Sequence, residues 1–267
     1  MKIGVCLKQV PASDSRIQIN ADGSGIVTDD IKWEINAYDE FALEAGIQLK
    51  EAKKAESLLI ISLGGKDAEA RIKDGIARGV KAKPEAVRLD DDAFAGSDSL
   101  GKARIIAAAV KKSGVNLLLC GKQAIDNDNA QVPAMVAELL GWAQVSVVDK
   151  LEVEGDTLTA NRVMGGGAVD TVTASLPAVV TCEKGLNTPR FASLPGIMKA
   201  KRAKIPVWGA GELELDASTV GAGAALVSTG SLSLPAARPE GTILDGGSPE
   251  EKVQKLVSAL RNDAKVI

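Results

Sequence analysis

Short apolar runs alternate with longer amphipathic stretches along the first two-thirds of this chain of 267 residues. The apolar runs have the length of buried strands, and the stretches between them place apolar residues at helical spacing. Strands that alternate with helices of this length indicate an α/β fold, with a mostly parallel sheet and helices on both of its faces. The expected strands cover residues 3–8, 58–63, 86–89 and 115–120, and the expected helices cover about 38–54, 66–79, 98–113 and 129–140.

The pattern changes after Trp142. Shorter apolar segments follow, separated by tight turns, and they predict antiparallel edge strands that extend the same sheet. These strands are expected at 145–148, 151–154, 157–163, 171–174 and 178–182.

Residues 206–267 are rich in Gly, Ala, Ser and Pro and contain few large apolar side chains. Such a segment cannot build a core of its own. It ends in an amphipathic helix, for which Ser248 is the expected N-cap and Glu250 and Glu251 are first-turn acids. The sequence therefore predicts an α/β domain over 1–205 and an extended C-terminal arm over 206–267, which either packs on a partner subunit or packs on its own domain.

The composition limits the possible binding partners and the expected cellular compartment of the protein. The net charge of −3 argues against nucleic acid as a partner, and no run reaches the ~18 apolar residues of a membrane span. The chain begins like a strand and not like a signal peptide. Cys6, Cys120 and Cys182 are too scattered for a disulfide framework or a metal site, so buried free thiols are expected. These features predict a cytoplasmic protein without membrane insertion.

The chain contains no histidine. This excludes Ser-His-Asp and Cys-His catalysis, zinc sites with histidine ligands, and acid–base chemistry by histidine. We therefore expect no catalytic side chain and no bound metal, as in a binding or carrier protein.

The segment 121–141, GKQAIDNDNAQVPAMVAELLG, is the strongest candidate for a nucleotide site. It joins an apolar run to a helix, and open α/β sheets bind ligands at the carboxyl ends of their strands. Amide groups at the helix start can bind a phosphate, Gly121 permits close approach of the backbone, and Asp126 and Asp128 could accept hydrogen bonds from a ribose. The alternative is that these polar residues only cap the helix. No P-loop sequence is present, so ATP hydrolysis of that type is not indicated.

Two further segments are weaker candidates. Residues 36–39 precede a predicted helix and include Tyr38, the only tyrosine of the chain. An aromatic side chain there either packs in the core or flanks a planar ring. Residues 162–167 are expected to form a glycine-rich turn. The turn gives only weak support for a phosphate site, because no helix obviously follows it.

Residues 186–202 read LNTPRFASLPGIMKAKR. Pro189 and Pro195 each fix φ and lack an N–H donor, so they predict an irregular loop. The loop combines apolar residues with a cationic run. A docking surface needs both, since an apolar anchor is buried on contact and charges steer the encounter. The other interpretation is a surface loop whose apolar side chains pack back on its own domain.

Taken together, these segments resemble the small (beta) subunit of electron-transfer flavoproteins. The resemblance runs from residue 1 to about residue 202 and is looser in the C-terminal helix. Its most specific parts are LLCGKQAIDNDNAQ, LPAVVTC and LNTPRFASLPGIMKAKR, and VPASDSRIQI and GIVTDDIKWEINAYDEFALEA support them.

The resemblance implies a Rossmann-like, adenine-nucleotide-binding domain in a heterodimer with a larger (alpha) subunit. The large subunit would hold most of the electron-carrying FAD, and this chain would hold a structural AMP. Electrons would come from flavin dehydrogenases, such as the acyl-CoA dehydrogenases of fatty acid oxidation, and pass to a downstream oxidoreductase. Tyr38 occupies the position whose aromatic ring lies near the flavin. The cofactor-binding residues carried over by position are Cys6, Asn36, Ala37, Tyr38, Asp39, Leu63, Gly121, Lys122, Gln123, Ala124, Ile125, Asp126, Asn127, Asp128, Asn129, Ala130, Gln131 and Val132.

The resemblance also makes residues 183–202 a recognition loop for partner dehydrogenases. Leu194 would be the anchor that enters a pocket on the partner, and Lys199 matches a lysine that is methylated in some relatives. The docking residues carried over are Arg190, Phe191, Leu194, Pro195, Ile197, Met198 and Lys199.

The sequence departs from the family pattern at three places. Gly165 or Gly166 stands where an acidic residue is usual, Asp170 replaces a glutamate, and Ala130 replaces an asparagine that is frequent in the AMP loop. Two alternatives stay open. One is a bifurcating member with a second FAD in place of AMP, and residues 130–132 are more similar to the members of that group. The other is a nucleotide-sensing module without electron transfer.

Overall fold

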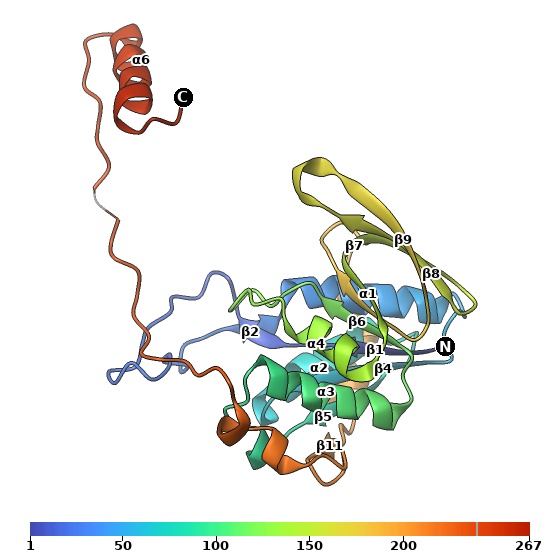
Figure 1. Cartoon of the computed structure of the whole chain (residues 1–267). Coiled ribbons are helices and arrows are strands. Elements are labelled where there is room, and N and C mark those ends of the chain that lie inside the picture. The colour runs from blue at the N-terminus through green and yellow to red at the C-terminus, as the bar shows by residue number, and fades with distance from the viewer. Residues whose placement is uncertain (239) are drawn as a thin grey trace.

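A mostly parallel sheet forms the centre of the computed structural model, which describes residues 1–238 and 240–267 (Figure 1). Over these residues the sheet has nine strands in the order β11-β5-β4-β1-β6-β10-β7-β8-β9. Their bounds are β1 (Lys2–Cys6), β4 (Ser57–Leu63), β5 (Glu85–Leu89), β6 (Leu117–Gly121), β7 (Ala143–Glu154), β8 (Thr157–Val163), β9 (Val169–Ser175), β10 (Ala178–Cys182) and β11 (Val207–Trp208). A separate antiparallel pair consists of β2 (Gln9–Pro11) and β3 (Trp33–Ile35).

Helices cover both faces of the sheet. On one face Leu43 of α1 (Ala37–Glu51) and Ile72 of α2 (Glu69–Arg78) are buried in one core cluster. On the other face Ile105 of α3 (Ser99–Ser113) and Val136 of α4 (Val132–Leu140) are buried in a second cluster. The remaining helical segments are α5 (Leu194–Lys201), α6 (Pro249–Ser258), the 3₁₀ turns Lys66–Ala68, Asp92–Phe94, Gly165–Gly167, Ala217–Thr219 and Ala222–Ala224, and the π turn Ala259–Asp263.

The predicted α/β class is confirmed, and so are the four expected strands of its first half. In β6, Leu117 and Leu119 enter one core while Leu118 enters the other, which explains why such strands are continuously apolar in the sequence. The helix expected at 129–140 begins later, at Val132. Ala130 just before it has a φ of +51°, which a right-handed helix does not permit.

The prediction of antiparallel edge strands is right for β8 and β9 and wrong for β10. β10 lies inside the sheet and pairs in parallel with both β6 and β7. All five of its residues are buried, as expected for a strand that is covered on both faces. The prediction was wrong because a short apolar run looks the same in the sequence whether its strand lies at the edge or in the interior of the sheet.

The strands expected at 145–148 and 151–154 form one strand, β7. Its first half pairs in parallel with β10 and its second half pairs antiparallel with β8. The change of partner occurs at Val148, and the register with β10 shifts at a bulge just before it, around Val147, which has a φ of +59°. Bulges of this kind bend a strand and increase its twist.

Residues 194–201, predicted to be irregular because of Pro195, form helix α5. The prediction was wrong because Pro195 lies in the first turn, where a missing N–H donor costs nothing. The hydroxyl of Ser193 caps the helix and accepts a hydrogen bond from the Gly196 N–H at 3.2 Å.

Residues 206–267 divide into two parts. The first part, which contains β11, Leu213 and Val220, belongs to the domain. β11 pairs with β5, and Leu213 and Val220 are buried in the core beside α3. The second part runs past the 20–25 turn, where the Leu232 N–H donates to the Gly23 carbonyl at 2.9 Å, and ends in helix α6, which stands apart from the domain (Figure 1).

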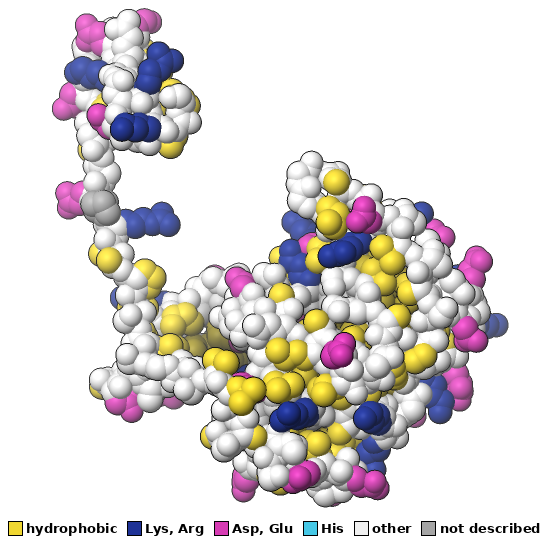
Figure 2. Space-filling model, in the orientation of Figure 1, with side chains coloured by type: hydrophobic (Ala, Val, Ile, Leu, Met, Phe, Trp, Pro, Cys, Tyr) yellow, Lys and Arg dark blue, Asp and Glu magenta, His cyan; other side chains and the backbone are white. Residues whose placement is uncertain are grey.

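Figure 2 shows apolar side chains exposed along this outstretched segment and on its terminal helix. Ser248 caps α6 as expected, since its hydroxyl accepts a hydrogen bond from the Glu251 N–H at 3.3 Å. Packing of the arm on a partner subunit stays a prediction. None of the helices described is both long and apolar enough to cross a membrane.

Candidate functional site

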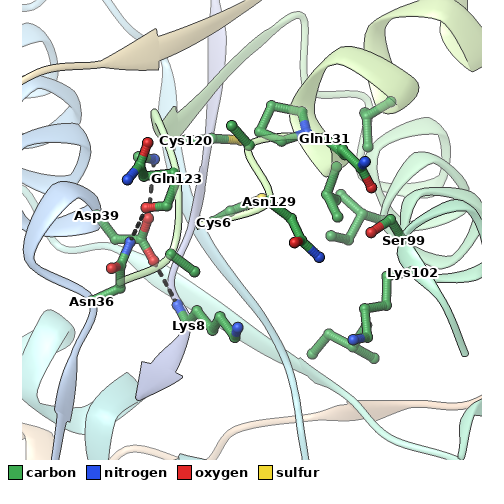
Figure 3. Close-up of a pocket in the computed structure, with 18 of the residues that line it drawn as sticks. Cys6, Lys8, Asn36, Asp39, Ser99, Lys102, Cys120, Gln123, Asn129 and Gln131 are labelled. Carbon is green, nitrogen blue, oxygen red and sulfur yellow. Dashed lines mark hydrogen bonds between the residues drawn. The ribbon is translucent and has the colours of Figure 1, made fainter. Parts of the chain in front are cut away.

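A cavity of about 200 Å³ opens at the carboxyl ends of β1, β4 and β6 (Figure 3). Its wall includes Cys6, Leu63 and Gly121, which end these three strands. The chain passes from β1 to β4 and β5 on one side and then returns to β6 on the other side. Open α/β sheets bind their ligands at such a reversal of strand order.

Most of the cofactor-binding residues that the resemblance implies are brought together here. Those that line the cavity are Cys6, Asn36, Asp39, Leu63, Gly121, Gln123, Ala124, Asn127, Asn129, Ala130, Gln131 and Val132. Those not among the lining residues are Ala37, Tyr38, Lys122, Ile125, Asp126 and Asp128. The structure thus joins four separate parts of the sequence in one site: residue 6, residues 36–39, residue 63 and residues 121–132.

Asn36 ties the loop after β6 to the start of α1. Its side chain is buried, and its amide nitrogen donates to the Gln123 carbonyl at 2.9 Å. Its Oδ1 accepts from the Ile125 N–H at 3.0 Å. A buried amide that is paired on both sides holds the loop in one shape.

Asp39 joins the ends of two strands to helix α1. Its carboxylate accepts from the Lys8 N–H at 2.8 Å and from the Gly121 N–H at 3.0 Å. Burial raises the pKa of Asp39 to about 6, although its hydrogen bonds act in the opposite direction. A Cβ at position 121 would collide with Asp39 and with the backbone of Tyr38. Glycine is therefore required at position 121 because helix α1 lies close to the backbone there.

Positive charge and helix amino termini surround the cavity. Lys8, between β1 and β2, and Lys102 of α3 line it (Figure 3), and the Lys8 ammonium pairs with Asp126 at 2.6 Å. Ser99 and Val132, the first residues of α3 and α4, also line it. The first N–H groups of a helix lack intrahelical partners and attract anions. The site is therefore suited to a ligand that carries a phosphate.

The sequence pattern does not indicate every residue of the wall. Lys8 is the last residue of the strand predicted over residues 3–8, so the rule about strand ends could have found it. Ser99 and Lys102 lie on α3, and only the order of the strands brings this helix to the cavity. The other lining residues outside the predicted set are Leu7, Ile61, Ile106, Cys120, Pro133 and Val136.

Tyr38 and Lys122 form a second cluster beside the cavity. The Lys122 ammonium lies 4.7 Å from the centroid of the Tyr38 ring and 2.5 Å from the Glu183 carboxylate. A hydrogen bond to Glu183 raises the pKa of Lys122. The cluster places an aromatic ring and an ion pair together at the ends of β6, β10 and α1.

Residues 186–202 are fixed to the domain through their backbone and through Arg190. The Arg190 guanidinium donates to the buried Glu44 carboxylate at 2.8 Å and to Glu51 at 2.9 Å. Gly196 lies against the Ala77 carbonyl of α2, where a Cβ would collide. The positive charge of Arg190 is therefore engaged inside the chain.

Four apolar side chains of the same segment point into solvent, whereas Leu186 packs against the core. Phe191 is 92% exposed and Leu194 is 73% exposed, and Ile197 and Met198 are also exposed. The interpretation in which these side chains pack back on their own domain does not hold for this segment. The structure thus combines a fixed backbone with a free apolar surface.

A parallel sheet with a ligand cavity at its reversal point defines the Rossmann-like class of α/β domains. The electron transfer flavoprotein domain family matches residues 24–213 of the chain. A protein from Bradyrhizobium diazoefficiens, named electron transfer flavoprotein subunit beta, is 34% identical over 271 residues, which covers 100% of both chains.

Two further relatives carry the same name. The protein from Bacillus subtilis is 34% identical over 268 residues and 100% of both chains. The protein from Homo sapiens is 37% identical over 223 residues, 81% of this chain and 84% of its own. The chain belongs to the electron transfer flavoprotein family, and these three relatives are named as beta subunits.

Proposed function

We propose that the chain is the small subunit of a heterodimeric electron carrier and that its cavity holds AMP. The large subunit would hold most of the FAD. Electrons would arrive from flavin dehydrogenases, including acyl-CoA dehydrogenases, and leave to a downstream oxidoreductase. The observation that carries the proposal is the cavity at the strand reversal, whose wall contains most of the residues that the family resemblance implies.

The chemistry of the wall fits an adenine mononucleotide. The amino terminus of α4 and the amide side chains of Asn129 and Gln131 supply donors for a phosphate. Cys6, Leu63 and Ile106 supply apolar surface for a planar base. AMP would therefore join three strands and two helices of the domain and stabilise their arrangement.

The flavin supplies the redox chemistry when it is bound, and this chain supplies its surroundings. Tyr38 offers an aromatic face, and Lys122 is held over that face by Glu183. The missing histidine is consistent with this role, because electron transfer needs no proton acceptor from this chain's side chains.

Helix α5 is proposed to dock partner dehydrogenases. Leu194 and Phe191 offer apolar anchors that are exposed in this chain and would be buried on contact. Lys199 lies on the same helix, is exposed, and can steer an acidic partner. Arg190 would act differently, because its ion pairs with Glu44 and Glu51 hold the segment in place.

Counting the bound nucleotides tests the proposal. The chain is co-expressed with the large subunit, and the nucleotides released by acid from the purified complex are identified and quantified. One FAD and one AMP per heterodimer is the expected result. Two FAD per heterodimer would favour a bifurcating carrier. A colourless chain that binds nucleotide but forms no complex with a large subunit would contradict the electron-carrier proposal and favour a sensor.

A further inference from the structure

The three cysteines of the chain are far apart in sequence and meet at the ends of three adjacent strands. Cys6 ends β1, Cys120 is the last residue but one of β6, and Cys182 ends β10. These strands are neighbours in the order β1-β6-β10. All three cysteines are free thiols.

Cys6 and Cys120 lie opposite each other on neighbouring strands. Val5 is paired with Leu119 in the parallel register, so the two cysteines are the next residues of their strands. Both line the cavity (Figure 3), and Cys6 packs against the core cluster that contains Cys120. Neighbouring strands are about 4.8 Å apart, which lies within the Cα separation of about 4.4–6.8 Å that a disulfide spans.

The two thiols differ in access. Cys6 is half-buried in the cavity wall, whereas Cys120 is 5% exposed. A hydrogen bond with Cys6, together with burial, raises the pKa of the Cys120 thiol. A solute in the cavity therefore meets Cys6 first, and Cys120 stands beside it as a second thiol. Cys182 faces the opposite core, where burial raises the pKa of its thiol.

We propose that Cys6 and Cys120 are a reversible redox-modification site in the cavity wall, open to a hydroperoxide when the cavity is empty. Hydrogen peroxide oxidises the Cys6 thiol to a sulfenic acid and leaves one water. The Cys120 sulfur then attacks the sulfenic sulfur, which forms the disulfide and releases a second water. Two thiols and one peroxide thus give one disulfide and two waters, and a dithiol reductant restores both thiols by exchange.

A bound nucleotide would block this oxidation, because it would cover the Cys6 side of the cavity. Only this second step of the inference rests on the proposed function; the disulfide itself does not.

The test uses the full-length chain, freed of nucleotide and treated with excess hydrogen peroxide. Intact mass should fall by two hydrogen atoms, peptide mapping should find Cys6 linked to Cys120, and dithiothreitol should reverse the change. The Cys6→Ala and Cys120→Ala variants should not form the link. The Cys182→Ala variant is the matched control and should form it at the rate of the unsubstituted chain.

Two results would overturn the pairing: stable oxygen addition at Cys6 without a link, or a link that uses Cys182. AMP at about ten times its Kd should slow the reaction about tenfold, since only the empty fraction reacts. Calorimetry on the same samples reports whether AMP binds. If AMP binds and the rate does not change, the protection is refuted. If AMP does not bind and the link forms, the AMP proposal fails and the disulfide stands.

Discussion

The cavity and helix α5 belong to one domain, yet their polar and apolar groups are arranged in opposite ways. Around the cavity, Asn36 and Asp39 are buried and their hydrogen bonds are completed inside the chain. On α5 the backbone is fixed, while Leu194 and the neighbouring Phe191 remain exposed to solvent. The first arrangement is complete within the chain, whereas the second leaves apolar surface exposed, as the docking role proposed above requires. Substitutions of these buried cavity residues should therefore affect folding, whereas substitutions of the exposed side chains of α5 should affect docking alone.

The largest effect is expected for Gly121→Ala. The added Cβ would collide with Asp39 and Tyr38, which should lower the free energy of unfolding by about 4 kcal/mol through overpacking and the loss of a buried hydrogen bond. Urea denaturation measures this change. Gly165→Ala is the control, since a Cβ there meets nothing within 4 Å, and should be neutral. Equal stability of the two variants would refute the role given to Gly121.

The second largest effect is expected for Asp39→Asn, which should remove a pH dependence of the free energy of unfolding. The pKa of Asp39 is raised by burial from 3.8 to about 6, so the folded protein binds an additional proton between these values. Its contribution to the free energy of unfolding is therefore greatest below about pH 4 and falls as the pH rises to about 6. The stability of the unsubstituted chain relative to Asp39→Asn should fall by about 2 kcal/mol from pH 4 to pH 7. Urea denaturation across this range measures it, and a constant difference would show that Asp39 titrates normally.

The smallest effect on folding, and the one confined to docking, is expected for Leu194→Ala. Since Leu194 is 73% exposed, the free energy of unfolding should change by less than about 0.5 kcal/mol. Loss of a central anchor should weaken docking by about 2 kcal/mol, or roughly 30-fold. The rate at which an acyl-CoA dehydrogenase reduces the heterodimer's flavin measures this loss. Leu139→Ala on α4 is the matched control. Equal rates for both variants would remove Leu194 as the anchor.

The sequence predicted the elements of the first half well because their pattern is local. Apolar runs such as 58–63 and amphipathic stretches such as 98–113 are decided by neighbours in the chain. β10 was misplaced because its position inside the sheet depends on β6 and β7, which lie on both sides of it. The helix at 194–201 was missed because the effect of a proline depends on its position. A proline in the interior of a helix interrupts it, but a proline in the first turn, such as Pro195, is compatible with it.

The site could be predicted only in part for a related reason. The 121–132 loop follows a strand and carries its own signal, and the family resemblance supplied Cys6 and Leu63. Lys102 comes to the cavity through the order of the strands, which no local pattern contains. The meeting of Cys6 and Cys120 has the same origin, since residues far apart in sequence become neighbours only when β1 pairs with β6.

The close contact between Gly196 and Ala77 has a consequence for the entropy of association. Ordering a flexible segment costs about 1–2 kcal/mol for each residue, and a mobile recognition loop would incur that cost each time it binds. α5 is already ordered when the domain has folded, so most of the contact energy of its exposed side chains remains available for affinity. Its backbone should therefore change little between the free and the docked protein, and binding should be limited by encounter and not by folding of the loop.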